Sequence, residues 1–351
     1  MGLKILHSAD WHMDSPFASF PEEQRAILRQ EQLRIPGRIA EICRRENCDL
    51  VLLAGDLFDG SPSRDTVETV KLALRECGVP VFVAPGNHDF CEVGSPWLEE
   101  RWPDNVHIFT AGITSIPLPD LNCRVWGAGY RSMDCPPMLE NFRAVGDEAW
   151  QIGVLHADPI TVRSPYCPVT AGQIRESGLA YLGLGHIHKA GMFRSGETLC
   201  AWPGCPMGRG WDETGDKGIC IVTIEESAQV RFLPLNTRRF HELEADVTDG
   251  VEAALDALLP AAESSDHFRI TLTGRTDADL EMIRRKYDRF PNLVLRDQTV
   301  AAGDIWEDAQ SDTLRGIYFR LLRDRAEESS RARLAAEISH RILSGREVKL
   351  P

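Results

Sequence analysis

Carboxylate, imidazole and amide side chains recur in this sequence in short motifs that can bind divalent metal ions. The motifs are Asp10-x-His12, Gly55-Asp56-x-x-Asp59, Gly86-Asn87-His88-Asp89, His156 and Gly185-His186-x-His188. Nitrogen and oxygen donors without thiolate favour Mn, Fe, Ni or Zn over Ca or Mg. One tetrahedral ion cannot use so many donors, so the set predicts two divalent ions that share a bridging carboxylate. The predicted ligands are Asp10, His12, Asp56, Asn87, His156, His186 and His188.

A pair of such ions indicates phosphoester chemistry. Two ions about 3.5–4 Å apart generate a nucleophile from water and stabilise charge on the attacked phosphate. Each motif alone is weak evidence, because acidic turns, turn asparagines and surface histidines are common. The ordered combination of all five motifs is what favours a dinuclear phosphoesterase site.

The elements that position these motifs follow from apolar runs and helical periodicity. Strands are predicted over 3–7, 49–54, 80–84, 150–155 and 180–184, and each ends in one of the motifs. Helices are predicted over 22–46, with a break or kink at Pro36-Gly37, and near 64–77. This alternation predicts a layered α/β domain, whose sites lie at the carboxyl ends of its strands. In extended chain, residues i and i+2 point the same way, so each two-donor motif can aim both donors at one place.

The sequence changes character near residue 236. Residues 240–300 predict a compact α+β unit, and residues 312–344 predict two helices. The expected domains are therefore 1–237, 238–303 and 304–351. An apolar stripe on the first of the two helices can pack within the chain or on a partner, and packing within the chain is the commoner outcome. The stripe consists of Leu314, Ile317, Tyr318, Leu321 and Leu322.

The composition narrows the class of protein. The chain has 351 residues, 43% of them hydrophobic and 26% charged, which is ordinary for a globular protein. A net charge of −14 disfavours a nucleic-acid binder driven by basic tails, but it leaves room for a local basic groove. Ten cysteines without a CxxC pair and no secretory signal favour reduced thiols and a cytoplasmic location. No apolar run approaches ~18 residues, so no membrane segment is expected.

The order of the motifs resembles the calcineurin-like metallophosphoesterase superfamily over roughly residues 3–235. The resemblance implies a four-layer α/β/β/α sandwich. It assigns Asp10, His12 and His188 to one metal and Asn87, His156 and His186 to the other, with Asp56 as the bridge. It also makes His88 the general acid for the leaving group. Asp59 is then placed to hold His88 in its productive orientation.

Three segments are similar to the bacterial SbcD- and YhaO-like DNA repair exonucleases: residues 7–17, 55–59 and the Pro-Gly, Gly-Arg and Glu-x-Gly-x-Lys-Gly strip at 202–218. This branch implies a Mn-dependent nuclease in which a metal-bridging hydroxide attacks DNA phosphodiesters in line. It further implies an α+β capping domain, an SbcC- or YhaN-like ATPase partner and a possible homodimer through the helix near 64–77. Archaeal and eukaryotic relatives carry histidine at the position of Asp59, which leaves His88 as the lone imidazole here.

Six residues near the motifs are expected to contact substrate, with Lys189 and Arg209 favoured because they adjoin motif residues. Basic side chains can position phosphates, and aromatic ones can stack an unpaired base. The other four are Arg131, Arg163, Tyr166 and Trp211. Two alternatives remain open at this stage. One is a small-molecule phosphodiesterase or phosphatase of the cyclic-nucleotide type, and the other is a nearly inactive scaffold for an ATPase.

Overall fold

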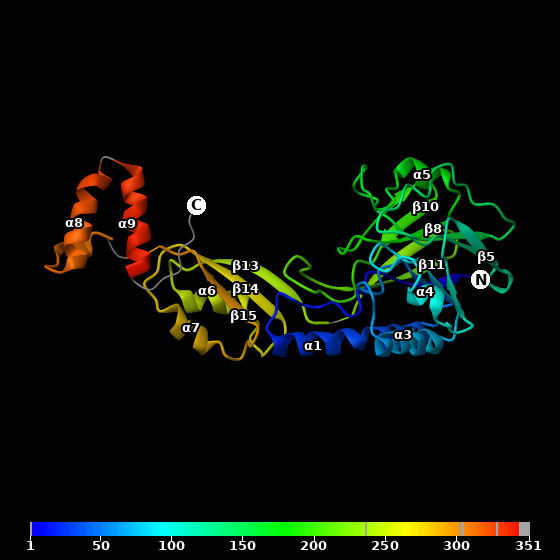
Figure 1. Cartoon of the computed structure of the whole chain (residues 1–351), viewed down its shortest axis with the longest axis horizontal. Coiled ribbons are helices and arrows are strands. Elements are labelled where there is room, and N and C mark those ends of the chain that lie inside the picture. The colour runs from blue at the N-terminus through cyan, green and yellow to red at the C-terminus, as the bar shows by residue number, and fades with distance from the viewer. Residues whose placement is uncertain (1, 236, 301, 303–304, 328, 344–351) are drawn as a thin grey trace. The chain divides into compact units, whose positions relative to one another are not determined.

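The computed structural model describes residues 2–235, 237–300, 302, 305–327 and 329–343. The chain forms two compact units, Met1–Arg239 and Phe240–Pro351 (Figure 1). The finer division of the second unit at residue 303 stays a prediction. Part of the predicted C-terminal helical segment, residues 304, 328 and 344–351, lies outside the described residues.

The first unit is built on two six-stranded sheets. In the first sheet the order is β12-β11-β1-β2-β3-β4, and in the second it is β5-β6-β7-β8-β10-β9. The first sheet contains β1 (Leu3–Ser8), β2 (Leu50–Leu53), β3 (Val81–Val83), β4 (Val106–Ile108), β11 (Gly218–Ile224) and β12 (Ala228–Pro234). The second contains β5 (Thr114–Leu118), β6 (Cys123–Gly127), β7 (Trp150–His156), β8 (Tyr181–Gly185), β9 (Gly191–Ser195) and β10 (Thr198–Trp202).

The strands that precede the motifs run parallel to one another. In the first sheet β1, β2, β3 and β4 are parallel neighbours, and in the second β6, β7 and β8 are. His156 at the end of β7 pairs with Gly185 at the end of β8. Parallel neighbours end at the same edge of a sheet. The loops after these strands therefore emerge together.

The two sheets pack face to face through a shared apolar core. Ile5, Leu52 and Phe82 of the first sheet lie in one buried cluster with Val154 and Ala201 of the second. Figure 1 shows the layers in order: α5 (Ala171–Glu176), the sheet with β8 and β10, the sheet with β11, and α3 (Arg64–Glu76). The predicted α/β/β/α sandwich is confirmed.

The helical segment predicted over 22–46 consists of two helices, α1 (Glu22–Leu33) and α2 (Ile35–Arg45). Pro36 lies in the first turn of α2, where its missing N–H is tolerated, so the break falls just before the proline. Helix α3 begins after Ser63, whose side chain accepts a hydrogen bond from the Thr66 backbone N–H. Two short elements follow along the chain, α4 (Pro96–Glu99) and the 3₁₀ turn η1 (Pro119–Leu121).

The second unit begins with a parallel three-stranded sheet of order β13-β14-β15. Its elements are β13 (Phe240–Asp246), α6 (Val251–Leu258), β14 (His267–Thr273), α7 (Leu280–Lys286) and β15 (Leu293–Asp297). Leu255, Ile270, Leu272 and Phe290 form the centre of its core. The 3₁₀ turn η2 (Glu307–Gln310) and the helices α8 (Leu314–Ala326) and α9 (Ser330–Leu343) follow.

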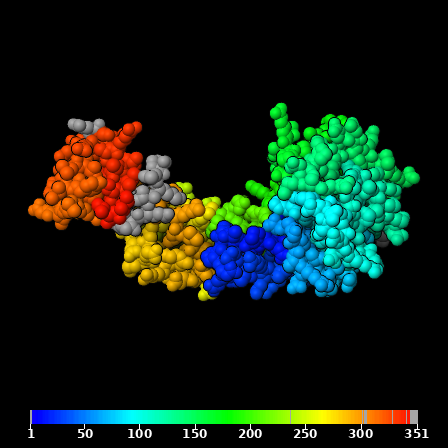
Figure 2. Space-filling model, viewed as in Figure 1, coloured from blue at the N-terminus to red at the C-terminus, as the bar shows by residue number. Residues whose placement is uncertain are grey.

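The apolar stripe on α8 is divided between solvent and the chain's own core. Leu314 is 84% exposed and Leu321 is 64% exposed, whereas Leu322 packs on the buried Phe319 and Ala336 of α9. Packing of the stripe within the chain is therefore wrong for Leu314 and Leu321 and is confirmed for Leu322. Figure 2 shows the α8–α9 pair, coloured orange and red, open to solvent on the face in view.

Two further expectations concern cysteines and membranes. All ten cysteines are free and buried. Among the residues that the structure describes, no helix combines the length and apolar character needed to cross a bilayer.

Candidate metal centre

The loops after β1 and β2 hold each other through their backbones. The Asp10 N–H donates to the Gly55 carbonyl and the His12 N–H to the Asp56 carbonyl, both at 2.9 Å. Asp10, His12 and Asp56 have φ values of 54°, 45° and 51°, in the left-handed region that non-glycine residues seldom adopt. Such conformations persist where the surroundings impose them, and they concentrate at functional sites. The conformation of each loop thus depends on the other.

Gly55 is required where the β2 loop turns. Its φ is +85°, and a Cβ atom there would lie 2.7 Å from both the Ala84 carbonyl oxygen and Nδ1 of His156. Only glycine fits both constraints. The residue after it, Asp56, is thereby brought against His156, which comes from the other sheet.

Donor atoms of Asp10, His12 and His188 converge in one group within 4.8 Å of one another. Nε2 of His12 lies 3.2 Å from Nε2 of His188, which in turn lies 3.8 Å from Oδ1 of Asp10. Two imidazole nitrogens that face each other at this distance share either a proton or a cation. These residues are the ones that the resemblance assigns to a single metal.

A second group contains Asp10, Asp56 and His156. Oδ2 of Asp56 lies 3.3 Å from Nε2 of His156 and 3.7 Å from Nε2 of His12. Oδ1 of Asn87 lies 3.0 Å from the same His156 nitrogen. The Asp56 carboxylate therefore stands between the two groups, the position that a bridging ligand needs.

His186 lies at the edge of this arrangement. Its Nε2 is 3.9 Å from Asp158, and its ring packs on His156 and Tyr166 at centroid distances of 5.3 Å and 4.8 Å. Within the described part of the chain, His186 belongs to none of the close groups of donors. Its backbone N–H instead donates to Oδ1 of Asp10 at 3.0 Å. Its role as a ligand stays a prediction.

Hydrogen bonds behind two of the histidines select the nitrogen that faces the centre. Nδ1 of His156 donates to the Ala54 carbonyl at 2.8 Å, and Nδ1 of His188 donates to Glu213 at 2.7 Å. Each leaves Nε2 for a metal, as is usual for metal-binding histidines. The donor set and its supports fit two divalent ions with nitrogen and oxygen ligands.

The buried charged groups of the centre shift one another's pKa values. Burial by itself lowers the pKa of His156, but the adjacent Asp56 carboxylate outweighs it and raises that pKa to about 10. Conversely, burial favours a neutral Asp56, but His156 and then His12 hold the pKa of Asp56 well below its usual range. Burial lowers the pKa of His12. The centre thus keeps Asp56 ionised, the form that binds cations.

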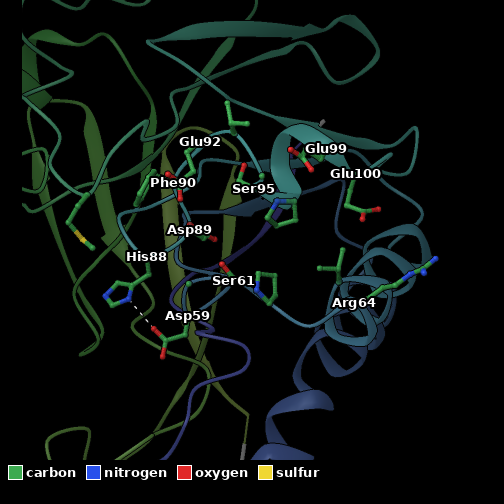
Figure 3. Close-up of a pocket in the computed structure, with 17 residues that line it drawn as sticks. Asp59, Ser61, Arg64, His88, Asp89, Phe90, Glu92, Ser95, Glu99 and Glu100 are labelled. Carbon is green, nitrogen blue, oxygen red and sulfur yellow. Dashed lines mark hydrogen bonds and ion pairs between the residues drawn. The ribbon is translucent and has the colours of Figure 1, made fainter.

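His88 and Asp59 lie beside the centre as a hydrogen-bonded pair. Nδ1 of His88 is 3.0 Å from Oδ1 of Asp59, and the His88 side chain is 43% exposed (Figure 3). The hydrogen bond that His88 donates to Asp59 raises the pKa of His88, against the effect of burial. The imidazole of His12, 3.7 Å away, and the hydrogen bond from His88 hold the pKa of Asp59 well below its usual range.

Asp89 has a structural role that the sequence did not reveal. Its buried carboxylate accepts backbone hydrogen bonds from Gly86 (2.7 Å), Leu57 (2.8 Å), Asp56 (3.2 Å) and Phe58 (3.3 Å). Burial, and then the Asp56 charge, raises its pKa to about 7. Asp89 therefore ties the loop carrying Asp56 to the loop carrying Asn87. Its place in Gly86-Asn87-His88-Asp89 was the one available signal.

The contacts of Ser15 and Glu213 with site residues were also not predicted from the sequence. The Ser15 hydroxyl donates to Oδ2 of Asp59 at 3.0 Å, and Glu213 accepts from His188. Glu213 lies in the 202–218 strip, so the strip itself was the signal. No spacing rule connects it to a histidine 25 residues earlier.

The expected substrate residues fall into two sets. Arg131, Arg163 and Lys189 are exposed. Tyr166 and Trp211 are half-buried, Tyr166 against His186. Arg209 is also half-buried, and its guanidinium is directed at Glu213, 2.8 Å away. Contact of these six with substrate stays a prediction.

A pocket of about 620 Å³ opens beside His88 and Asp59. Figure 3 shows these two residues at one end, with Glu99, Glu100 and Arg64 at the other. Among the charged side chains of the lining the acidic ones prevail, and Arg64 is the one arginine or lysine among the described residues that line it. The apolar contribution comes from Val67, Phe90, Val93, Pro62, Pro96 and Met133.

Comparisons with known proteins show which family the chain resembles. Residues 3–190 match the family model of calcineurin-like phosphoesterases. The chain is 33% identical over 240 residues to the uncharacterized metallophosphoesterase YhaO of Bacillus subtilis, covering 63% of this chain and 57% of YhaO. It is 23% identical over 336 residues to the SbcD subunit of the nuclease SbcCD from Staphylococcus epidermidis, covering 83% of this chain and 84% of that protein. A dimetal phosphatase structure from Danio rerio aligns at 17% identity over 65% of this chain and 98% of its own, with a TM-score of 0.43.

Proposed function

From the premise that this chain belongs to the calcineurin-like phosphoesterase family, we propose that it hydrolyses DNA phosphodiesters with two divalent metal ions, Mn²⁺ being the expected metal. The observation that carries the proposal is the position of Asp56, whose Oδ2 lies between Nε2 of His12 and Nε2 of His156. A carboxylate there can bridge two ions. Two bound ions would polarise the phosphate and lower the pKa of a bound water.

His88 is the proposed general acid. Its Nδ1–H is held by Asp59, which leaves Nε2 to face a substrate. Asp59 also raises the pKa of His88, so the ring is protonated over more of the neutral pH range than a free histidine. The ring can then donate its proton to the sugar oxygen that leaves phosphorus. Asp59 acts through His88 and is a positioning residue.

The support for DNA as the substrate comes from similarity. The relative with the larger coverage, SbcD of Staphylococcus epidermidis, is named as part of a nuclease, and this chain aligns with 84% of it. Lys189, Arg163 and Arg131 are exposed and free to approach phosphates, and Tyr166 beside His186 can stack a base. We place the activity in the cytoplasm, because ten buried and unpaired cysteines suit a reducing compartment.

A small phosphodiester is the second candidate substrate, and the pocket beside His88 favours it. Because His88 protonates the leaving group, that group lies on the side of His88, where the pocket opens. The acidic lining at Glu92, Glu99 and Glu100 repels a chain of further phosphates. A single nucleoside-sized leaving group fits this charge pattern better than a continuing strand does.

The test compares both substrates in one experiment. Purified protein is loaded with Mn²⁺ and given single-stranded DNA, double-stranded DNA or a cyclic nucleotide, with Asp56→Ala and His88→Ala as inactive controls. The proposal expects DNA cleavage that both variants abolish. DNA cleavage no faster than that of the control variants would contradict the proposal. Turnover of the cyclic nucleotide that is faster than DNA cleavage would establish the second candidate.

An ATPase partner of the SbcC or YhaN type is also proposed, with the exposed stripe on α8 as its docking surface. Ile317 and Leu321 are 48% and 64% exposed, so aspartate at either position should leave folding intact. Co-expression with such an ATPase should then give co-purification that Ile317→Asp and Leu321→Asp abolish. Co-purification unaffected by both would remove α8 as the surface. A homodimer through α3 is a further proposal, tested by the mass of the protein in solution.

A further inference from the structure

A chain of hydrogen bonds runs from His188 in the metal centre to Asp59 beside His88. Nδ1 of His188 donates to Oε1 of Glu213 at 2.7 Å, and Nη2 of Arg209 donates to the same oxygen at 2.8 Å. Nη1 of Arg209 reaches the Ser15 hydroxyl at 3.4 Å, and that hydroxyl donates to Oδ2 of Asp59 at 3.0 Å. Two sites of chemistry, His188 and His88, are thereby connected through side chains alone.

The members of this chain are enclosed and well satisfied. Glu213 is 5% exposed and Ser15 is 3% exposed. A buried carboxylate is costly unless it is paired and hydrogen-bonded. Both oxygens of Glu213 have partners, because Oε1 accepts from His188 and Arg209 while Oε2 accepts from the Arg209 backbone N–H at 2.7 Å. The pair is held rigidly in the loop between β10 and β11.

Arg209 was expected to bind a substrate phosphate, but its guanidinium is directed inward. Nε donates to Glu213 at 3.3 Å, Nη2 donates to the same carboxylate, and Nη1 points to Ser15. All three nitrogens therefore have partners within the protein. Swinging the guanidinium out to a phosphate would leave Glu213 without its counter-charge in a buried place, which opposes that movement.

We propose that Arg209 is a positioning residue that couples the metal centre to the general acid. It contacts Glu213 on the side of the metal centre and Ser15 on the side of the general acid. Glu213 fixes the proton on Nδ1 of His188 and so keeps Nε2 free for a metal. Ser15 fixes Oδ2 of Asp59 and so keeps Oδ1 directed at His88. This inference rests on the dinuclear site proposed above, and it does not depend on DNA being the substrate.

The experiment measures Mn²⁺ affinity by calorimetry without substrate, and kcat and KM with a chromogenic phosphodiester. The variants are Glu213→Gln, Arg209→Gln, Ser15→Ala and the Arg209→Gln double variants with each of the other two. Arg124→Gln is the matched control, since Arg124 pairs with Glu148 at 2.7 Å in a similarly enclosed place in β6. Thermal unfolding identifies any variant that fails to fold.

Loss of Glu213 should weaken Mn²⁺ binding about tenfold or more, as loss of a carboxylate behind a metal-binding histidine does. Arg209→Gln should weaken Mn²⁺ binding and lower kcat while KM changes little. Ser15→Ala should lower kcat alone, and it keeps the test available if the Glu213 variant does not fold. Because the effects of linked residues are not additive, each double variant should have a kcat and an Mn²⁺ affinity close to those of the more impaired of its two single variants.

Two results would overturn the inference. If Arg209→Gln raises KM and leaves Mn²⁺ affinity unchanged, Arg209 contacts substrate. If the reductions in kcat caused by Ser15→Ala and Arg209→Gln multiply in the double variant, the two residues act independently. The calorimetry needs no substrate, so failure to cleave DNA would count against the proposed function without touching this result.

Discussion

Oδ1 of Asp59 lies 3.0 Å from Nδ1 of His88, while Oδ2 of the same carboxylate accepts a hydrogen bond from Ser15. Asp56, three residues earlier, is 2% exposed and has His12 and His156 at its Oδ2. His12 lies 3.7 Å from both carboxylates of Gly55-Asp56-x-x-Asp59, but His156 is near Asp56 alone, whereas His88 and Ser15 are hydrogen-bonded to the Asp59 side chain. One faces the metal centre, and the other faces the imidazole beside it. Their loss should have different consequences.

Asp59→Asn should leave Mn²⁺ binding intact and lower kcat about tenfold to a hundredfold, because His88 loses its orienting partner. The variant should also change the pH dependence of kcat. Asp59 raises the pKa of His88, and an acid is active only while protonated, so removing the carboxylate should move the alkaline limb to lower pH. Calorimetry and a pH–rate profile measure both effects. An emptied metal site, or an unmoved alkaline limb, would show that Asp59 has another role.

Asp56→Asn should impair metal binding and activity together. An amide has one neutral oxygen where the carboxylate has two charged ones, so it cannot bridge two cations. Calorimetry should show at least one Mn²⁺ fewer per chain, with turnover near that of the Asp56→Ala control. Two ions bound with unchanged affinity would argue against the bridging role.

Gly55→Ala and Gly60→Ala should lower the free energy of unfolding by different amounts, although both glycines have positive φ. At Gly60, φ is +81° and nothing lies within 4 Å of a new Cβ, so alanine should cost only the backbone strain of about 1–2 kcal/mol. At Gly55 the same strain applies, and the Cβ atom also meets His156. Gly55→Ala should therefore lose more free energy of unfolding in urea, and it should weaken Mn²⁺ binding. Equal costs for the two variants would contradict the packing described at Gly55.

His7 should make the protein sensitive to acid. It is fully buried on β1 beside Tyr181, whose hydroxyl is 2.7 Å from Nδ1, and burial lowers its pKa to about 3. The unfolded chain takes up a proton near pH 6.5, but the folded protein does not until about pH 3. This contribution to stability is therefore complete above pH 6.5 and decreases as the pH falls below it, by on the order of 1 kcal/mol at pH 5.5.

The matched variant is His7→Gln, which keeps a polar group for Tyr181 but cannot titrate. Unfolding in urea at pH 7.5 and pH 5.5, with chelator present for both proteins, gives the difference. The free energy of unfolding of the variant should fall less than that of the unmodified protein over this range, by on the order of 1 kcal/mol. Equal losses would mean that His7 takes up its proton in the folded state.

The sequence allowed much of this cluster of donor side chains to be predicted, because each motif follows a strand and parallel strands end at one edge. Asp10, His12, Asp56, His156 and His188 were placed near one another on that basis. Glu213 was not predicted, since its contact with His188 joins segments with no periodic relation. Exposure of Leu321 was not predicted either, because a stripe at helical spacing has the same pattern whether it is covered or open.

Pairing within the sheets was likewise beyond the sequence. Apolar runs indicated the strands, but nothing in them specified that β11 would pair antiparallel with β1. Asp89 illustrates the same limit at the site. Its neighbours Gly86, Asp56, Leu57 and Phe58 are defined only after two separate loops have met.

The central claim is that two metal ions share Asp56, and an anomalous-difference map from Mn²⁺-soaked crystals tests it most directly. We expect two peaks about 3.5–4 Å apart, with Asp56 in contact with both. His12 and His188 should lie at one ion, and His156 and Asn87 at the other. A single peak, or two peaks of which only one touches Asp56, would contradict it.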